Sequence, residues 1–366
     1  MILRNSLLKL KSYIIPAVVI STAGMLASCG QEDVNTVSVW KNLNRTDSTG
    51  LESIATRIDT VTFRTDSLFD IRIFGVSDDR FFGLTADDII VVLSHDGRVL
   101  DSHDIHGRGP GEFTNLTSII YDQYNDEILI YDTWNKIIRL DADGNFKDEM
   151  KNGETVLVGD IAPLGKSLYA ATGISNSERE FSITVLDRDF NPVHRMMPLM
   201  NDAQRSKRGI IAFEGIDVFN SKVLYKPFGE YTYYEITDSS FTPYLRVDCG
   251  KHEMPAEMHV AVTGNKPIKK YFQIQYEAIC GRYYMIEYLF SKNNMWYYDV
   301  YDTETGKRML HTTYTEEDFD NGVDAGFIFR FGGHEYRIIP QFEKDNVLYW
   351  SRFNDDGSTT LFRIQL

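Results

Sequence analysis

The sequence predicts an all-β protein, a six-bladed β-propeller of four-stranded antiparallel blades. Runs of four to six β-branched and aromatic residues, too short for helices, recur along the chain and end in Asp, Asn or Gly turns. These runs form six clusters at intervals of roughly 45 to 65 residues, and such a repeated sheet is typical of a propeller. No long Pro/Gly/Ser linker separates the clusters, which favours one closed ring over unrelated domains.

Residues 118–147 show the pattern within one blade. Four short runs are separated by turn dipeptides such as Asp143-Gly144, so they predict an up-and-down sheet. The four predicted strands are Ser118–Tyr121, Glu127–Tyr131, Lys136–Leu140 and Asn145–Lys147.

The last cluster has one strand too few. It offers Tyr336–Phe342, Val347–Phe353 and Thr359–Gln365 before the chain ends. We expect the missing outer strand to come from Ala55–Phe63, near the other end of the chain. Its pairing with Thr359–Gln365 closes the ring and protects an exposed sheet edge.

Residues 1–28 are predicted to be a lipoprotein signal peptide. Three basic residues precede an apolar stretch, Tyr13–Ala23, and Leu26-Ala27-Ser28-Cys29 matches a lipoprotein cleavage site. The thiol of Cys29 accepts the lipid and becomes the new N-terminus. The apolar stretch is too short for a spanning helix and contains Pro16.

The signal peptide is followed by a predicted polar tether, residues 29–52, and by the propeller, residues 53–366. Removing residues 1–28 takes away three basic and no acidic residues, which changes the net charge from −15 to −18. Such a charge argues against nucleic-acid partners and against a polybasic contact with lipid. The predicted membrane contact is therefore the lipidated Cys29 alone.

Two cysteines remain in the mature chain, Cys249 and Cys280. An envelope compartment permits a disulfide between them, whereas two buried free thiols are the interpretation that we favour.

The strongest local motif is Gly107-Arg108-Gly109-Pro110-Gly111-Glu112-Phe113. Gly107, Gly109, Pro110 and Gly111 predict a rigid, tightly turned loop between the first two blades. Its charged residues, Arg108 and Glu112, are candidates for ligand binding, although a purely structural crossover is the favoured interpretation.

Other candidate ligand-binding residues are His106, Tyr276 and Tyr336. The two tyrosines are candidates for rings that line the propeller axis and stack on a sugar, although packing in the core is the favoured interpretation for each. We expect no metal site, because residues 103 and 106 of one strand point to opposite faces. Gly159–Ser167 resembles a phosphate-binding loop with one residue too many and predicts a turn. The sequence has no motif that indicates a cofactor or a catalytic residue, and nothing selects a pair among its 53 acids.

The Gly107–Phe113 loop behind a lipoprotein signal resembles the six-bladed β-propeller lipoproteins of gut-type Gram-negative anaerobes, which are NHL/TolB-like propellers. Asp320-Asn321-Gly322 with Gly326-Phe327 resembles a later glycine-rich loop of that family. The resemblance implies a propeller and an envelope location, and it implies no catalytic residues.

These observations predict an outer-membrane lipoprotein, exposed at the cell surface or on the periplasmic face. We expect a binding or scaffold protein whose ligand is a glycan, a peptide or a partner envelope protein. The alternative is a glycan hydrolase or lyase with its site on the propeller axis.

Overall fold

The computed structural model describes residues 34–43, 49–64, 70–132, 136–151, 158–173, 180–200, 215–219, 221–259, 270–290 and 295–366. Residues 34–366 form one compact unit. The predicted signal peptide, Cys29 and the start of the predicted tether lie outside the described residues. In the described part, no helix is long and apolar enough to cross a membrane.

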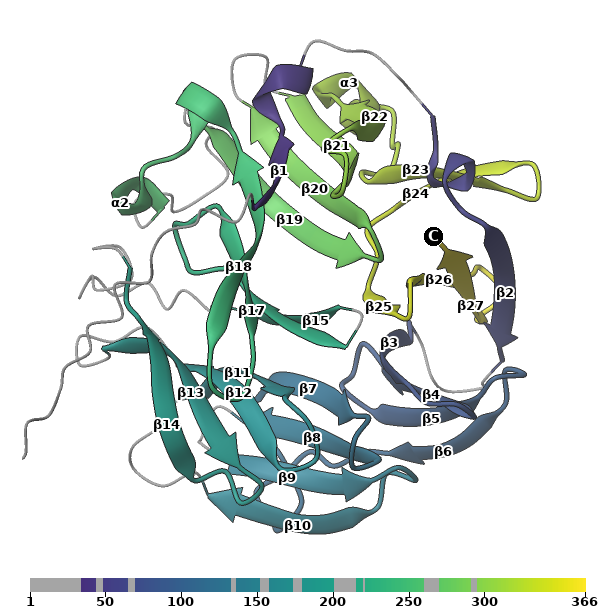
Figure 1. Ribbon diagram of the computed structural model, residues 1–366. Helices are drawn as coiled ribbons and strands as arrows, with labels where there is room; N and C mark the ends of the chain where they lie inside the picture. The colour runs from purple at the N-terminus through teal and green to yellow at the C-terminus, as the bar shows by residue number, and fades with distance from the viewer. Residues whose placement is uncertain are drawn as a thin grey trace, which may run out of the picture. The chain divides into compact units, whose positions relative to one another are not determined.

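Six blades of four antiparallel strands each form a ring, which confirms the predicted six-bladed propeller (Figure 1). The first three blades follow one another directly in the chain. Their strands are β3 (Arg72–Val76), β4 (Arg80–Leu84), β5 (Ile90–Ser94) and β6 (Val99–His103) in blade one; β7 (Leu116–Asp122), β8 (Glu127–Asp132), β9 (Lys136–Asp141) and β10 (Phe146–Lys151) in blade two; β11 (Val158–Pro163), β12 (Leu168–Gly173), β13 (Phe181–Asp187) and β14 (Pro192–Pro198) in blade three.

Blades four to six repeat the order, with the innermost strand first in the chain. They contain β15 (Ile216–Phe219), β16 (Lys222–Tyr225), β17 (Thr232–Ile236) and β18 (Phe241–Asp248) in blade four; β19 (Phe272–Cys280), β20 (Tyr283–Phe290), β21 (Met295–Asp302) and β22 (Arg308–Tyr314) in blade five; β25 (Phe342–Lys344), β26 (Val347–Phe353), β27 (Thr359–Gln365) and the N-terminal β2 (Arg57–Phe63) in blade six. Short helical segments are η1 (Trp40–Asn42), η2 (Leu51–Ser53), η3 (Gly250–His252), α2 (Ala256–His259) and α3 (Glu316–Asp320).

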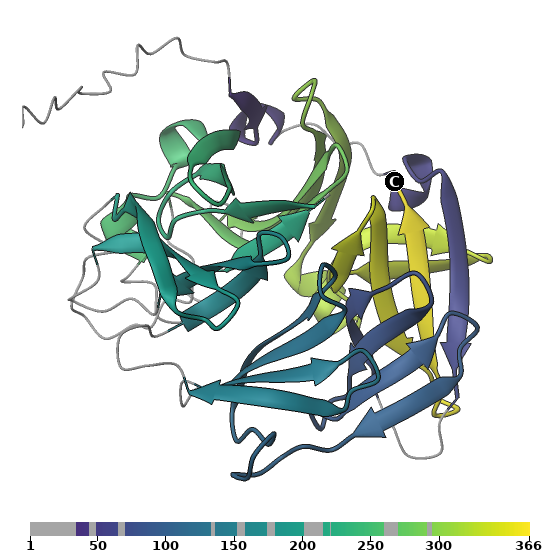
Figure 2. The same cartoon turned by 60° about the horizontal axis from the view of Figure 1, so that its bottom comes forward.

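The ring closes as predicted. β2 pairs antiparallel with β27 over seven residues, from Arg57 opposite Gln365 to Phe63 opposite Thr359, and the two strands lie side by side in both views (Figures 1 and 2). This pairing joins the two ends of the propeller and leaves no gap between the last strand and the first.

The segment predicted as a tether contains one more strand, β1 (Asn35–Ser38). It pairs in parallel with the outer edge of β18 and gives blade four a fifth strand. Side chains reinforce the contact, because Ser38 and Trp40 both donate hydrogen bonds to Asp248, at 2.6 and 2.9 Å. The short polar run carries no sequence periodicity that would have indicated a strand.

One predicted strand of the sixth blade is wrong. Tyr336–Phe342 is not the innermost strand; residues 334–338 form β24 (His334–Ile338), which pairs with β23 (Phe327–Phe331) in a separate hairpin. The innermost strand is the three-residue β25, which begins at Phe342. Alternating polar and apolar residues predict a strand in either place, because the pattern does not say which sheet the strand joins.

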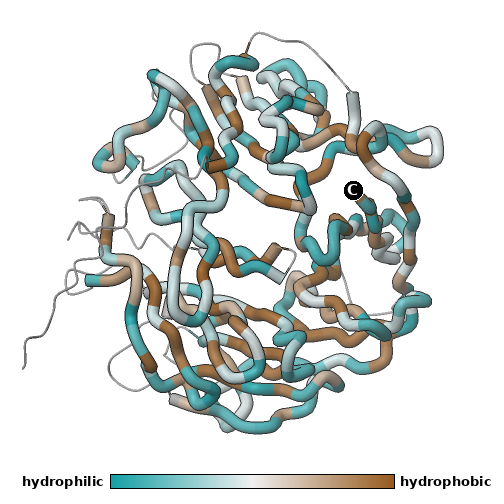
Figure 3. Tube along the Cα trace, viewed as in Figure 1, coloured by the Kyte–Doolittle hydropathy of each residue, from teal (hydrophilic) through white to brown (hydrophobic). Residues whose placement is uncertain are grey.

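The hydrophobic core is divided among the interfaces between blades. In β5, Ile90 and Val92 pack towards blade two, whereas Val91 and Leu93 pack towards blade six. The strand period of two therefore gives each blade two apolar faces. Brown stretches along the strands and teal turns reflect this pattern (Figure 3).

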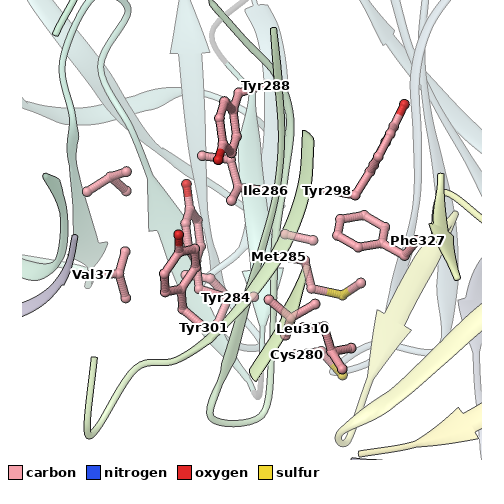
Figure 4. Close-up of a cluster of buried hydrophobic side chains, with 14 of the residues drawn as sticks. Val37, Cys280, Tyr284, Met285, Ile286, Tyr288, Tyr298, Tyr301, Leu310 and Phe327 are labelled. Atoms are coloured by element: carbon pink, nitrogen blue, oxygen red, sulfur yellow. The ribbon is translucent and has the colours of Figure 1, made fainter. Parts of the chain in front are cut away.

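Blade five shows the same division with large aromatic residues. Tyr284 and Ile286 lie on one side of the sheet, and Met285 lies on the other with Phe327 of β23 (Figure 4). These side chains are buried. Packing of this kind makes the blades rigid supports for the innermost strands.

Candidate functional site

The innermost strands of all six blades surround a central cavity of about 460 Å³. We call this cavity the channel. It is lined by residues of β3, β7, β11, β15, β19 and β25 and by neighbouring loop residues. Its volume is within the range of small-molecule binding sites, and each lining side chain is held by a strand of a different blade.

Carboxyl groups line the channel on four consecutive blades. Asp160 lies on β11, Asp217 on β15, Glu277 on β19 and Glu343 on β25. They are about 60 residues apart in the sequence, which is the repeat distance of the blades. The fold therefore gathers four acids that no local motif connects.

Asp160 is fully supplied with hydrogen bonds. Its carboxylate accepts from the Ser118 hydroxyl at 2.8 Å, the Ile216 amide at 3.1 Å and the Ile161 amide at 2.9 Å. Burial nevertheless raises the pKa of Asp160 above its ordinary value. Because the donors come from three blades, this carboxylate fixes blades two, three and four to one another at the channel wall.

Asp217 has a different environment. Within the described residues, no group donates a hydrogen bond to its carboxyl group. Burial, and then the nearby carboxylates of Asp160 and Glu277, raise its pKa from 3.8 to about 7, although Lys226 opposes the shift. Asp217 is therefore an unpaired acid that titrates near neutral pH.

Glu277 is held by a cation and by tyrosine. It forms an ion pair with Lys226 and accepts a hydrogen bond of 2.5 Å from the Tyr284 hydroxyl. Burial, and then the Glu277 carboxylate, raise the pKa of both Tyr284 and Tyr233 well above the ordinary value. Both hydroxyls therefore stay protonated and remain hydrogen-bond donors.

Glu343 is buried at the channel wall, with 7% of its surface exposed. One carboxyl oxygen accepts a hydrogen bond of 3.3 Å from the Asn346 amide, whereas Oε2 is buried without a partner. Burial raises the pKa of Glu343 from 4.5 to about 8. This side chain is held at a cost in free energy that a partner at Oε2 would reduce.

Tyr276 lies on β19, between the strands that carry Asp217 and Glu343. Its hydroxyl donates to the Pro340 carbonyl at 3.1 Å. Burial raises the pKa of Tyr276, and the carboxylates of Asp217 and Glu343 both contribute to the shift. The ring therefore lies near both acids in the channel wall, and a role for Tyr276 in ligand binding stays a prediction.

The glycine-rich loop lies between β6 and β7, where the sequence predicts it. Lys136 donates to the carbonyls of Gly109 and Glu112, at 2.8 and 2.9 Å, and pairs with Glu149 at 2.5 Å. The Glu112 carboxylate in turn accepts from the Gly109 amide at 2.7 Å. These bonds tie the loop to blade two, and Glu112 serves the backbone within it.

Gly111 shows why the loop needs glycine. Its φ is +76°, and a Cβ atom there would lie 2.7 Å from the Phe146 ring. Any other residue would be strained and would displace that ring. Arg108 is exposed at the surface of the loop and lines a second cavity, of about 370 Å³, with Gly107 and Glu112.

The remaining predicted ligand-binding residues lie outside the channel. His106 is exposed beside the loop, where its ring packs on Phe113 and its Nδ1 lies 2.9 Å from Asp104. Tyr336 is on the β23–β24 hairpin and packs against Phe362. Of the five candidate residues named from the sequence, Tyr276 alone lines the channel.

Cys249 and Cys280 are buried free thiols, so the alternative of a disulfide between them is wrong. Burial raises the pKa of both thiols, which makes them unreactive. Gly159–Ser167 spans most of β11 and the turn that precedes β12, as predicted. Within the described ranges, no three His, Cys, Asp or Glu side chains are grouped so that they could hold a metal ion.

Comparison with known families gives a match over nearly the whole ring. Residues 34–361 match the family described as a domain of unknown function, DUF4934. The chain belongs to this family. No curated protein matches the DUF4934 chain.

Two solved structures share the propeller fold. A protein described as exported, from Bacteroides fragilis, is 14% identical with a TM-score of 0.65, and the match covers 91% of this chain and 99% of the other. A member of the DUF4221 family from Bacteroides vulgatus is 10% identical with a TM-score of 0.52, over 85% and 96% of the two chains. At these identities the likeness concerns the fold alone.

The sequence contains a signal for the channel acids that only the repeat makes visible. In each of blades three to six, the first strand contains one acid, as in Ile216-Asp217-Val218-Phe219. Local motifs miss them because each strand supplies one acid only.

Proposed function

We propose that this DUF4934 protein is a lipid-anchored binding protein of the bacterial envelope and that its ligand enters the channel. The observation that carries the proposal is the channel itself, a cavity formed by all six blades in which the Asp217 carboxyl group and Oε2 of Glu343 have no hydrogen-bond donor among the described residues. Rigid, well-packed blades hold these groups in place, so little ordering is needed when a ligand binds.

The envelope location rests on the lipoprotein signal and on the lipidation site at Cys29. The similar fold of an exported Bacteroides fragilis protein supports the same location. The ligand classes are those expected from the sequence, a glycan, a peptide or a partner protein that inserts a side chain. Arg108 and Glu112 remain candidates for a second contact surface at the glycine-rich loop.

A thermal-shift screen of the full chain in detergent, against glycans and peptides, tests the proposal. A ligand of the folded state raises the melting temperature. Val218 lines the channel and is 37% exposed, so Val218→Trp is expected to fill the space and abolish the shift. Val193→Trp, at a 55% exposed position on β14, is the matched control and should retain it. Equal shifts in both variants would refute binding in the channel.

A second function is supported by the acid pair Asp217 and Glu343. Carboxyl groups with pKa values raised to about 7 and about 8 are suited to donate a proton at neutral pH. This favours a glycan hydrolase or lyase as the alternative, with its acid in the channel. Product formed from a glycan by the unmodified chain, and lost in Asp217→Asn, would establish the enzyme.

A further inference from the structure

The channel carries more negative than positive groups. Five acids and one lysine line it. The lysine, Lys344, donates to the Val76 carbonyl at 2.6 Å. The five acids are Asp160, Asp217, Glu277, Glu343 and Asp345.

Partners within the protein account for two of these acids. Asp160 accepts three hydrogen bonds, and Glu277 is neutralised by Lys226. Asp217 receives no hydrogen bond from the described residues, and Oε2 of Glu343 is buried without a partner although 93% of that side chain's surface is covered. The two acids that lack a donor, Asp217 and Glu343, therefore lie on the inner strands of the blades on either side of the blade that carries Tyr276.

Resting on the proposed function, we infer that the ligand of the channel carries a cationic amine that binds the Asp217 carboxyl group, with Tyr276 and Glu343 lining the same channel. An ammonium group donates three hydrogen bonds and carries a positive charge, and among the described residues the Asp217 carboxyl group has no hydrogen-bond donor. An aromatic ring next to the cation adds a favourable interaction. The amine is either a small free amine or the lysine side chain of a peptide, since the recognising chemistry is the same.

Two observations favour an organic amine over other ligands. Within the described residues no group of three acids is placed to share a metal ion, so a divalent cation lacks its ligands. A cation stabilises the ionised form of these carboxyl groups, which burial disfavours, whereas a neutral sugar does not.

Isothermal titration calorimetry of the full chain in detergent tests the inference with two pairs of probes. Cadaverine is compared with the neutral 1,5-pentanediol, and the tripeptide Gly-Lys-Gly with Gly-norleucine-Gly. We expect an amine to bind and its neutral partner to show no heat. Binding of cadaverine alone indicates a small amine, and binding of the lysine peptide indicates a peptide side chain.

Variants locate the binding. Asp217→Asn and Glu343→Gln each remove an ionisable carboxyl group with little change of shape, and we expect Asp217→Asn to weaken amine binding at least tenfold and Glu343→Gln to weaken it less. Asp355→Asn, at an exposed position in the turn before β27, is the matched control and should bind as the unmodified chain does. Unchanged circular dichroism and melting temperature show that the variants fold.

Three results would overturn the inference: neither amine binds, Asp217→Asn binds as tightly as the unmodified chain, or Ca²⁺ binds in place of the amines. A neutral ligand lost in Val218→Trp but retained in Asp217→Asn would leave the proposed function standing and refute the amine. A ligand retained in Val218→Trp would instead refute the channel as the site.

Discussion

The glycine-rich loop and the channel are both polar sites, and they differ in how their charges are satisfied. In the loop, Lys136, Glu112 and Glu149 bind one another and the backbone. In the channel, Asp217 and Oε2 of Glu343 have no hydrogen-bond donor within the part of the chain that the structure describes. The polar groups of the loop therefore stabilise the conformation of the loop itself, whereas those of the channel are available to a ligand. A conspicuous motif can be structural while scattered acids form the site.

The largest effect is expected where the channel wall depends on one ion pair. Glu277→Ala leaves Lys226 and two tyrosine hydroxyls without their acceptor, so the free energy of unfolding should fall by about 3 kcal/mol. Urea denaturation measures this loss of unfolding free energy. Glu304→Ala, whose side chain is 65% exposed in an ion pair with Arg282, should cost less than about 0.5 kcal/mol. Equal losses would contradict the buried role of Glu277.

The unpaired acids should make stability depend on pH. Because folding raises the pKa of Asp217 to about 7 and that of Glu343 to about 8, the folded chain binds more protons than the unfolded chain between about pH 4 and 8. Stability should therefore fall as the pH rises through this range, with a slope of at most about 1.4 kcal/mol per pH unit for each of the two acids. Urea denaturation at pH 5 and 8 measures the loss.

Asp217→Asn identifies the group responsible. This variant should lose part of the pH dependence, because an amide does not titrate, while the control Asp355→Asn should keep all of it. If both variants follow the unmodified chain, Asp217 does not change its protonation over this range, and the contrast between channel and loop is weaker than the geometry indicates.

A substitution that weakens the contacts of the glycine-rich loop should lower the stability of the protein and leave its affinity for a channel ligand unchanged. Lys136→Met removes the donor to two carbonyls and the partner of Glu149, so the free energy of unfolding should fall by about 1 to 2 kcal/mol. Affinity for a channel ligand should stay the same. Lys166→Met, at an exposed position, serves as the control, and a loss of affinity in Lys136→Met alone would show that the two sites are coupled.

The smallest effect is expected for Arg108→Ala. The side chain is exposed, and its removal should change the free energy of unfolding by less than about 0.5 kcal/mol. Titration of a channel ligand should give the same affinity. Loss of a ligand in this variant would make the loop a second binding surface, as the sequence allows for Arg108.

The six-bladed ring follows from local patterns in the sequence. Alternation such as Ile90-Val91-Val92-Leu93 sends side chains to both faces of a blade, and the count of repeats requires a closing strand, which β2 supplies. These features are local and periodic, so they can be read from neighbouring residues.

Tertiary structure alone decided the rest. Whether residues 334–338 join blade six or a separate hairpin, and whether Asn35–Ser38 pairs with β18, depends on which edge is free. Asp217 and Glu343 line the same channel only because the ring brings the first strands of their blades to its axis. Burial there, and the missing donors, set their pKa values, and burial is a property of the assembled ring that no single strand carries.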